Sequence, residues 1–195
     1  VVQPWEFGGL PDDWVAPLGA LADEVWCYTS WVRDCYVRSG VPAERVRVLP
    51  IGVDAERFRP DGPRYPLRTG RTTRLLFVGG LIHRKGIDVL LDAYGRAFGP
   101  DDDVCLVVKS FGGDGVYRNA PGTTLLQQAM ARPDGPEIEW IDHDLDQAEM
   151  AALYRSCDAL VHPYRGEGFG MPIAEAMASG LAVVVTDDGA ARDFC

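Results

Sequence analysis

The sequence predicts an α/β protein built on a Rossmann-like, doubly wound parallel sheet, with a remnant of a second Rossmann-like domain. Short runs of β-branched residues alternate with longer amphipathic stretches, which is typical of strand–helix repeats. Several of the short runs are apolar throughout, as a parallel sheet covered by helices on both faces requires. Glycine-rich turns follow two of these runs, at the edge where such sheets bind ligands.

The predicted elements keep this alternation along the chain. The expected strands are 24–28, 45–49, 73–78, 104–108, 138–141, 159–162 and 181–186. The expected helices are 12–20, 30–39, 86–98, 123–132, 147–156 and 172–179. Asp146 and Glu149 have the spacing of a capping box, and Gly180 stands where a helix end calls for a left-handed residue.

A proline- and arginine-rich stretch interrupts the alternation and predicts a linker. Its run Pro60-Asp61-Gly62-Pro63 is incompatible with a helix or a central strand. The part before it has too few strand signals for a domain, and the part after it has one strand fewer than the usual six. We expect residues 1–55 to be the C-terminal part of one domain, 56–72 the linker, and 73–195 a second domain truncated at its C-terminus.

Composition excludes several classes of protein. The 195 residues are 47% hydrophobic and 25% charged, as in soluble globular proteins. The net charge of -10 disfavours nucleic acid as a partner, so an anionic ligand needs a local cationic site. The five cysteines form no C-x-x-C pair, which favours reduced thiols. No apolar run is long enough for a transmembrane segment, and we expect neither such a segment nor a leader peptide.

The first chemical motif is a glycine turn with two basic residues between a predicted strand and a predicted helix. Gly79 and Gly80 allow backbone to approach a ligand closely, and the next helix offers its N-terminal N–H groups to an anion. Arg84 and Lys85 add two adjacent cations. The motif suits a diphosphate, although a solvated basic turn is the plain alternative.

The second motif places two carboxylates around a glycine-rich loop. Glu167 lies in this loop directly after a predicted strand. Glu175 lies about one turn into a helix that Pro172 is suited to start. Both are expected at the carboxyl ends of the strands, where open α/β sheets bind ligands. Taken alone, Glu175 is equally well explained as an acid at a helix N-terminus.

Together these motifs resemble the retaining glycosyltransferases of family 4, also called group 1, which have the two-domain GT-B fold. Residues 167–180 read EGFGMPIAEAMASG, similar to the paired-glutamate signature of that family. The 79–86 loop is similar to its diphosphate loop, and PIGVD at 50–54 to its crossover between domains. Residues 30–42 resemble the helix that precedes the crossover.

The resemblance implies a role for each matching residue. Arg84 and Lys85 would hold the donor diphosphate and stabilise charge on the leaving nucleotide. Glu175 would accept hydrogen bonds from the ribose hydroxyls. Gly79 and Gly80 would contact the donor through their backbone.

The remaining implied contacts concern the sugar and the base. Glu167 would lie near the donor sugar, with the backbone of Phe169, Gly170 and Met171 against its hydroxyls. Residues 142–145 would border the base, and 109–115 are expected on the same side of the sheet. The resemblance implies transfer with retention, by a front-face or a double-displacement route, and leaves Glu167 unassigned as a nucleophile.

Partners follow from the same resemblance. The donor would be a UDP-, GDP- or ADP-linked sugar and the acceptor a glycan or a lipid-linked acceptor, with no other cofactor. The acidic clusters 101–103 and 142–144 superficially resemble metal motifs, but we expect no metal because Arg84 and Lys85 supply the charge. The expected location is the cytoplasm, including the cytoplasmic face of a membrane.

Three alternatives share this architecture. One is a non-catalytic module that binds nucleotide sugars, and another is a GT-B sugar-nucleotide epimerase. A phosphorylase would need a lysine site for pyridoxal phosphate, which the sequence does not show. In the leading interpretation residues 1–55 belong to the acceptor domain and 73–195 to the donor domain, so we expect this chain to be inactive alone.

Overall fold

The computed structural model describes residues 5–110 and 121–195 and divides the chain into two compact units. The first unit contains the described residues up to Gly52, together with Gly166–Met171 and Thr186–Cys195. The second unit contains Val53–Arg165 and Pro172–Val185. Residues 53–72, which include the predicted linker 56–72 and are called the crossover below, therefore cluster with the second unit.

The described part of the second unit contains a five-stranded parallel sheet. Its strand order is β5-β4-β3-β6-β7. The strands are β3 (Thr73–Val78), β4 (Val104–Lys109), β5 (Glu137–Ile141), β6 (Ala159–His162) and β7 (Ala182–Val185). The order runs outward from β3 to β5 on one side and from β6 to β7 on the other, so it reverses between β3 and β6. This is the doubly wound arrangement that the sequence predicts.

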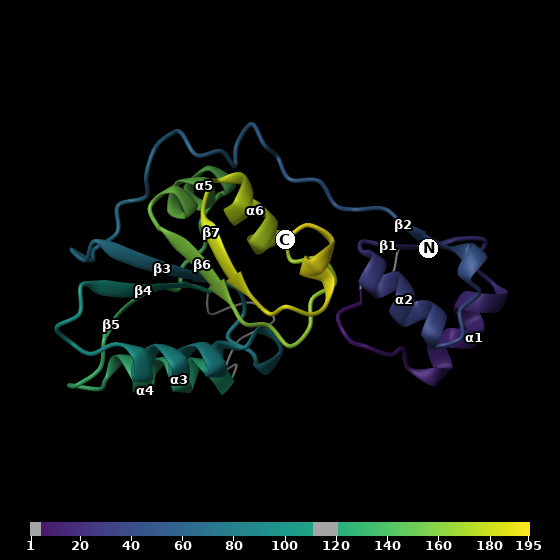
Figure 1. Cartoon of the computed structure of the whole chain (residues 1–195), viewed down its shortest axis with the longest axis horizontal. Helices are drawn as coiled ribbons and strands as arrows, with labels where there is room; N and C mark the ends of the chain where they lie inside the picture. The colour runs from purple at the N-terminus through teal and green to yellow at the C-terminus, as the bar shows by residue number, and fades with distance from the viewer. Residues whose placement is uncertain (1–4, 111–120) are drawn as a thin grey trace. The chain divides into compact units, whose positions relative to one another are not determined.

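Helices cover both faces of this sheet (Figure 1). On one face lie α3 (Ile87–Ala97) and α4 (Pro121–Met130). On the other face lie α5 (Gln147–Arg155) and α6 (Met171–Ala178). Right-handed crossovers place their helices on one face of the sheet, and on the other face once the strand order reverses. This layering therefore follows from the topology.

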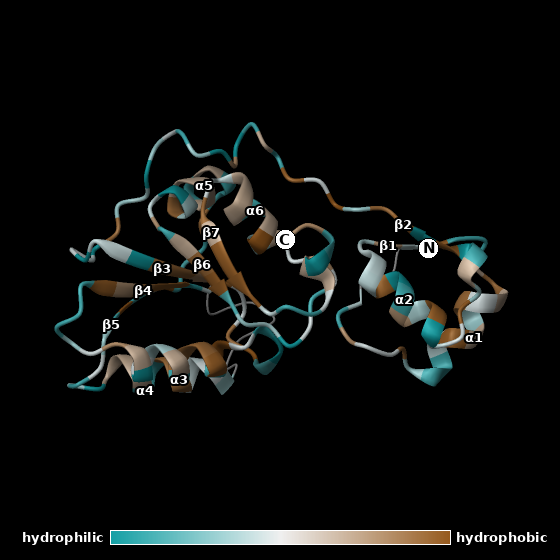
Figure 2. Ribbon diagram, in the orientation of Figure 1, coloured by the Kyte–Doolittle hydropathy of each residue, from teal (hydrophilic) through white to brown (hydrophobic). Residues whose placement is uncertain are grey.

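The central strands are apolar because helices cover them on both sides. All six residues of β4 are buried, and most of the strand is drawn in brown in Figure 2. Its Leu106 and Val108 pack with Phe77 of β3 and with Leu90 and Tyr94 of α3 in one core cluster. The prediction of strands buried on both faces is confirmed for β4. The edge strand β7 is more exposed.

Local signals locate several of the helix ends. In α5 the Asp146 Oδ1 accepts from the Glu149 N–H and the Glu149 Oε2 from the Asp146 N–H, both at 2.8 Å, which confirms the capping box. Gly180 has φ +83°, the left-handed conformation expected. Helix α4 is described over Pro121–Met130, where the sequence predicts 123–132.

The first unit contains a two-stranded parallel sheet and two helices among its described residues. The strands are β1 (Val25–Cys27) and β2 (Val46–Val48), and the helices are α1 (Asp12–Ala20) and α2 (Ser30–Arg38). The buried Thr29 side chain accepts from the Val32 N–H at 3.3 Å and begins α2. Each strand is shorter than predicted by one residue at each end.

Short 3-10 turns complete the chain and were not predicted. They are η1 (Ala43–Arg45), η2 (His83–Lys85) and η3 (Ala190–Asp193). All five cysteines are free thiols, and four of them are buried. Within the part of the chain that the structure describes, no helix is long and apolar enough to cross a bilayer.

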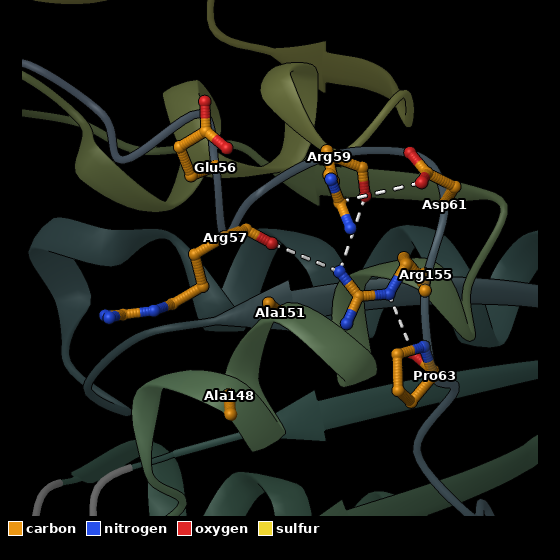
Figure 3. Close-up of a pocket in the computed structure, with 9 residues that line it drawn as sticks. Glu56, Arg57, Arg59, Asp61, Pro63, Ala148, Ala151 and Arg155 are labelled. Atoms are coloured by element: carbon orange, nitrogen blue, oxygen red, sulfur yellow. Dashed lines mark hydrogen bonds and ion pairs between the residues drawn. The ribbon is translucent and has the colours of Figure 1, made fainter.

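The crossover is fastened to α5 by one buried arginine (Figure 3). Arg155 is 9% exposed and donates to the carbonyl oxygens of Pro63 at 2.7 Å, Arg57 at 3.2 Å and Arg59 at 3.4 Å. The crossover and α5 enclose a pocket of about 210 Å³ around this guanidinium. Since the arginine binds backbone carbonyls, the pocket marks a structural clamp.

Candidate functional site

The predicted diphosphate loop lies at the carboxyl end of β3, where the strand order reverses. Gly79 and Gly80 are buried and follow directly on the strand. The Ile82 N–H donates to the Gly80 carbonyl at 2.8 Å and the Lys85 N–H to the Ile82 carbonyl at 3.0 Å. The resulting turn η2 presents Arg84 and Lys85 half-buried at the start of α3.

One glycine of this loop, Gly86, is required by close packing. Gly86 has φ +74°, and a Cβ at this position would collide with the carbonyl oxygen of Pro163. A Cβ at Gly79 would lie 3.7 Å from the side-chain carbons of Lys85 and 3.6 Å from the His162 ring. The stem of Lys85 therefore lies over Gly79, beside the carboxyl end of β6.

Arg165 joins the segment after β6 to this turn. Its Nη1 donates to the His83 carbonyl at 2.7 Å, and its backbone N–H donates to the Arg84 carbonyl at 2.8 Å. Its guanidinium also pairs with both oxygens of Asp88, at 2.7 and 2.8 Å. The hydrogen bond from Arg165 holds the pKa of Asp88 below its usual value.

Glu175 lies in the first turns of α6 and is half-buried. Its Oε2 accepts a hydrogen bond from the Tyr154 hydroxyl at 2.9 Å. Burial raises the pKa of Glu175, and the bond from Tyr154 partly offsets that rise. Phe58 of the crossover packs edge-on against Tyr154, with ring centroids 5.9 Å apart. Glu175 is thus anchored through α5 to the crossover.

The glycine-rich loop 166–171 clusters with the first unit. Glu167 is 5% exposed there, and Gly170 is buried with φ +97°. The Phe169 ring lies 5.0 Å from the Phe194 ring. The Thr29 hydroxyl donates to the Gly168 carbonyl at 3.3 Å. These contacts fix the loop within the first unit.

Met171 of the same loop is the first residue of α6. The structure therefore brings Arg84, Lys85 and Glu175 into one unit and assigns Glu167, Phe169 and Gly170 to the other.

The carboxyl ends of β4 and β5 carry further polar residues. Lys109 is buried, which lowers the pKa of its ammonium, while the charges of Asp142 and Asp144 oppose that shift. The His143 Nε2 lies 3.3 Å from the Tyr65 hydroxyl. Residues 111–115, expected on this side of the sheet, lie outside the described residues.

The family model "Glycosyl transferases group 1" matches residues 72–195 of this chain. This match covers the sheet of the second unit and the loop 79–86, and it also includes Glu167 and Glu175.

The chain belongs to the group 1 glycosyltransferases.

Curated relatives of this group 1 chain are glycosyltransferases. It is 31% identical over 198 residues to a D-inositol 3-phosphate glycosyltransferase 1 of Catenulispora acidiphila, covering 96% of this chain and 47% of that protein. It is also 31% identical over 186 residues to a GDP-mannose-dependent alpha-mannosyltransferase of Mycobacterium tuberculosis, covering 93% and 43%. The chain thus spans about half the length of the curated relatives it matches.

Solved structures confirm the GT-B fold for this chain. Anabaena HepE, solved in complex with UDP and glucose, matches with a TM-score of 0.75 at 19% identity, over 93% of this chain and 49% of HepE. At that identity the likeness supports the fold alone.

Sequence reasoning missed the residues that hold this site in place. Arg165 lies directly before the glycine-rich loop and received no predicted role, and Tyr154 and Arg155 were only parts of a predicted helix. A signal for Arg165 was present: doubly wound topology puts the ends of β3 and β6 side by side, so 163–165 had to lie next to the basic turn. Hydrogen bonds from α5 to crossover carbonyls leave no pattern in the sequence.

Proposed function

We propose that this chain binds the donor in a retaining sugar transfer from a nucleoside-diphosphate sugar to a glycan or lipid-linked acceptor. One observation carries the proposal. Arg84 and Lys85 sit on a glycine turn at the carboxyl ends of β3 and β6, in a chain whose net charge is -10. A cationic turn at this reversal point suits a diphosphate, which an acidic surface would otherwise repel.

The chemistry needs charge stabilisation at the leaving group. As the bond between sugar and diphosphate breaks, negative charge grows on the phosphate oxygens. Arg84 and Lys85, with the N–H groups at the start of α3, would stabilise that charge. Because these cations supply the positive charge, we propose that transfer needs no metal ion.

The carboxylates would orient the donor. In this proposal the ionised Glu175 accepts hydrogen bonds from the ribose hydroxyls, and its anchoring by Tyr154 supports that role because the bond uses only Oε2. Glu167 and the backbone of Phe169, Gly170 and Met171 would serve the sugar. Gly79 and Gly80 would lie against the diphosphate.

Relatives narrow the donors to test. One relative is named for GDP-mannose and HepE was solved with UDP, so GDP- and UDP-sugars come first and ADP-sugars next. The free thiols agree with the proposed cytoplasmic location, which includes the face of a membrane.

Calorimetry of this chain with UDP, GDP, ADP and their sugar conjugates tests the proposal. We expect one nucleoside diphosphate to bind selectively, and Lys85→Ala to weaken it about tenfold, the loss of one charged contact. Arg96→Ala, which removes an exposed cation from the far end of α3, is the control and should leave affinity unchanged. Chelation with EDTA should also leave it unchanged.

Two outcomes would count against the proposal. If none of the nucleotides binds to this chain or to the intact protein, the donor-binding role is wrong. If a nucleotide binds but the intact protein transfers no sugar, the non-catalytic module becomes the better interpretation. Retention is tested separately, because the anomeric configuration of the product can be read by NMR.

A further inference from the structure

We propose that Arg165 is a positioning residue for the donor diphosphate, holding the η2 turn that carries Arg84 and Lys85. The inference rests on the proposed function, since it concerns how the two cations are kept in place. Arg165 acts through the turn and is given no contact with the donor. Nothing in the family match or in the named relatives assigns it a role.

Arg165 binds the turn itself. Its Nη1 donates to the His83 carbonyl at 2.7 Å and its backbone N–H to the Arg84 carbonyl at 2.8 Å. Two consecutive peptide groups of η2 are therefore held from one residue. The side chains of Arg84 and Lys85 emerge from this held backbone.

The guanidinium of Arg165 is also fixed by a second partner. It pairs with both oxygens of Asp88, in the first turn of α3, at 2.7 and 2.8 Å. Such a two-point pair sets the plane of the guanidinium as well as its distance. Lysine cannot reproduce it, because an ammonium is a single point charge without the planar fork.

The surrounding packing leaves the turn little freedom. Gly86 lies so close to the Pro163 carbonyl that no Cβ fits between them. The side chains of Arg165 and Asp88 are only 36% and 34% exposed. The Arg96–Asp92 pair further along α3 is 79% and 67% exposed and follows the ordinary i,i+4 pattern of a surface pair.

The test measures affinity for UDP and GDP by calorimetry in the wild type and in Arg165→Gln, Arg165→Lys and Arg96→Gln. We expect Arg165→Gln and Arg165→Lys to weaken the nucleotide about tenfold, the equivalent of one charged hydrogen bond. Arg96→Gln removes an arginine–aspartate pair from the same helix and should change affinity less than about twofold. Thermal unfolding of each variant checks that the fold is intact.

A thermodynamic cycle separates positioning from general support of the fold. Arg165→Gln is repeated in a background that already carries Arg84→Ala and Lys85→Ala. If Arg165 works through those cations, its substitution has little further effect there. A full tenfold loss in that background overturns the proposal, because Arg165 would then act independently of the cations.

The remaining outcomes are also decisive. A wild type that binds neither nucleotide overturns the proposed function and this inference with it. A wild type that binds, with loss in Lys85→Ala but none in Arg165→Gln, overturns this inference alone. If Arg165→Lys binds like the wild type, charge suffices and the two-point pair has no positioning role.

Discussion

Two segments of the second unit are each held by one arginine, in different ways. Arg165 holds the η2 turn and pairs with the carboxylate of Asp88, and its side chain is 36% exposed. Arg155 holds the crossover through three backbone carbonyls, and it is 9% exposed. Among the described residues Arg155 has no carboxylate within ion-pair distance.

The two arginines therefore have different expected roles: one stabilises the fold, and the other positions the η2 turn. A buried arginine that satisfies carbonyl groups supports the fold, because its removal leaves polar groups without partners. A half-exposed arginine in a two-point ion pair adds less to stability, since solvent screens the pair, but it fixes geometry. Loss of Arg155 should therefore lower stability, whereas loss of Arg165 should lower affinity.

The largest effect on stability is expected at Gly86, where the packing leaves no space for a side chain. Gly86→Ala combines a left-handed φ of +74° with a collision against the Pro163 carbonyl. We expect a loss of about 4 kcal/mol in the free energy of unfolding, from backbone strain and overpacking together. Urea denaturation measures it.

Gly70→Ala is the matched control from the crossover. A Cβ there meets nothing within 4 Å and φ is not left-handed, so its stability should stay within about 0.5 kcal/mol. Equal losses in the two alanine variants would show that the tight contact at Gly86 is not the cause.

The second effect tests the buried arginine. Arg155→Met keeps the apolar stem but leaves the carbonyls of Arg57, Arg59 and Pro63 without their donor. We expect a loss of about 3 kcal/mol in the free energy of unfolding, while nucleotide affinity at low temperature changes little.

Arg59→Met serves as its control. The Arg59 side chain is 52% exposed and pairs with Asp61 at 3.6 Å, so its loss should cost below about 0.5 kcal/mol. If Arg155→Met proves as harmless as Arg59→Met, the clamp on the crossover contributes nothing to stability.

How far the sequence predicts this molecule depends on the range of the interactions. The strands 73–78 and 159–162 and the capping box at Asp146 and Glu149 match the structure, because apolar periodicity and local hydrogen bonds are written in neighbouring residues. The ends of an element differ from the prediction where tertiary contacts determine them, as at β7, which is two residues shorter than predicted.

The candidate site was predictable only in its chemical groups. The cations of the basic turn and the paired glutamates stand out in the sequence, but their roles stay predictions. The assignment of 166–171 to the first unit depends on contacts such as Thr29 to Gly168, between residues 139 positions apart. Contacts between residues so far apart in the sequence form only in the folded chain, and no local sequence pattern predicts them.

The smallest effect on stability is expected at the residue next to Arg155. Tyr154 is fully buried and donates to Glu175, while Phe58 of the crossover packs against its ring. Tyr154→Phe removes one hydroxyl and keeps the ring contact, so the loss of stability should be about 1 kcal/mol. The same substitution should also change how the affinity for nucleotide depends on pH.

Burial raises the pKa of Glu175 above the ordinary 4.5, and the Tyr154 hydroxyl lowers it part of the way back. A raised carboxyl pKa favours folding below 4.5, and that contribution fades as pH rises through the folded pKa. The affinity for nucleotide depends on pH in the opposite direction, because the ribose hydroxyls need the ionised carboxylate of Glu175 as acceptor. Affinity should therefore fall on acidification, and in Tyr154→Phe the fall should begin at higher pH.

Calorimetry with UDP and GDP at a series of pH values from the ordinary carboxyl pKa of 4.5 upward measures that midpoint. Tyr94→Phe is the control, since Tyr94 is also buried but donates to the Glu137 carbonyl at 2.8 Å. A midpoint that moves in Tyr154→Phe and stays in Tyr94→Phe would assign the titration to Glu175. An unchanged midpoint in both would remove Glu175 from the binding site, while leaving the phosphate contacts of the basic turn untouched.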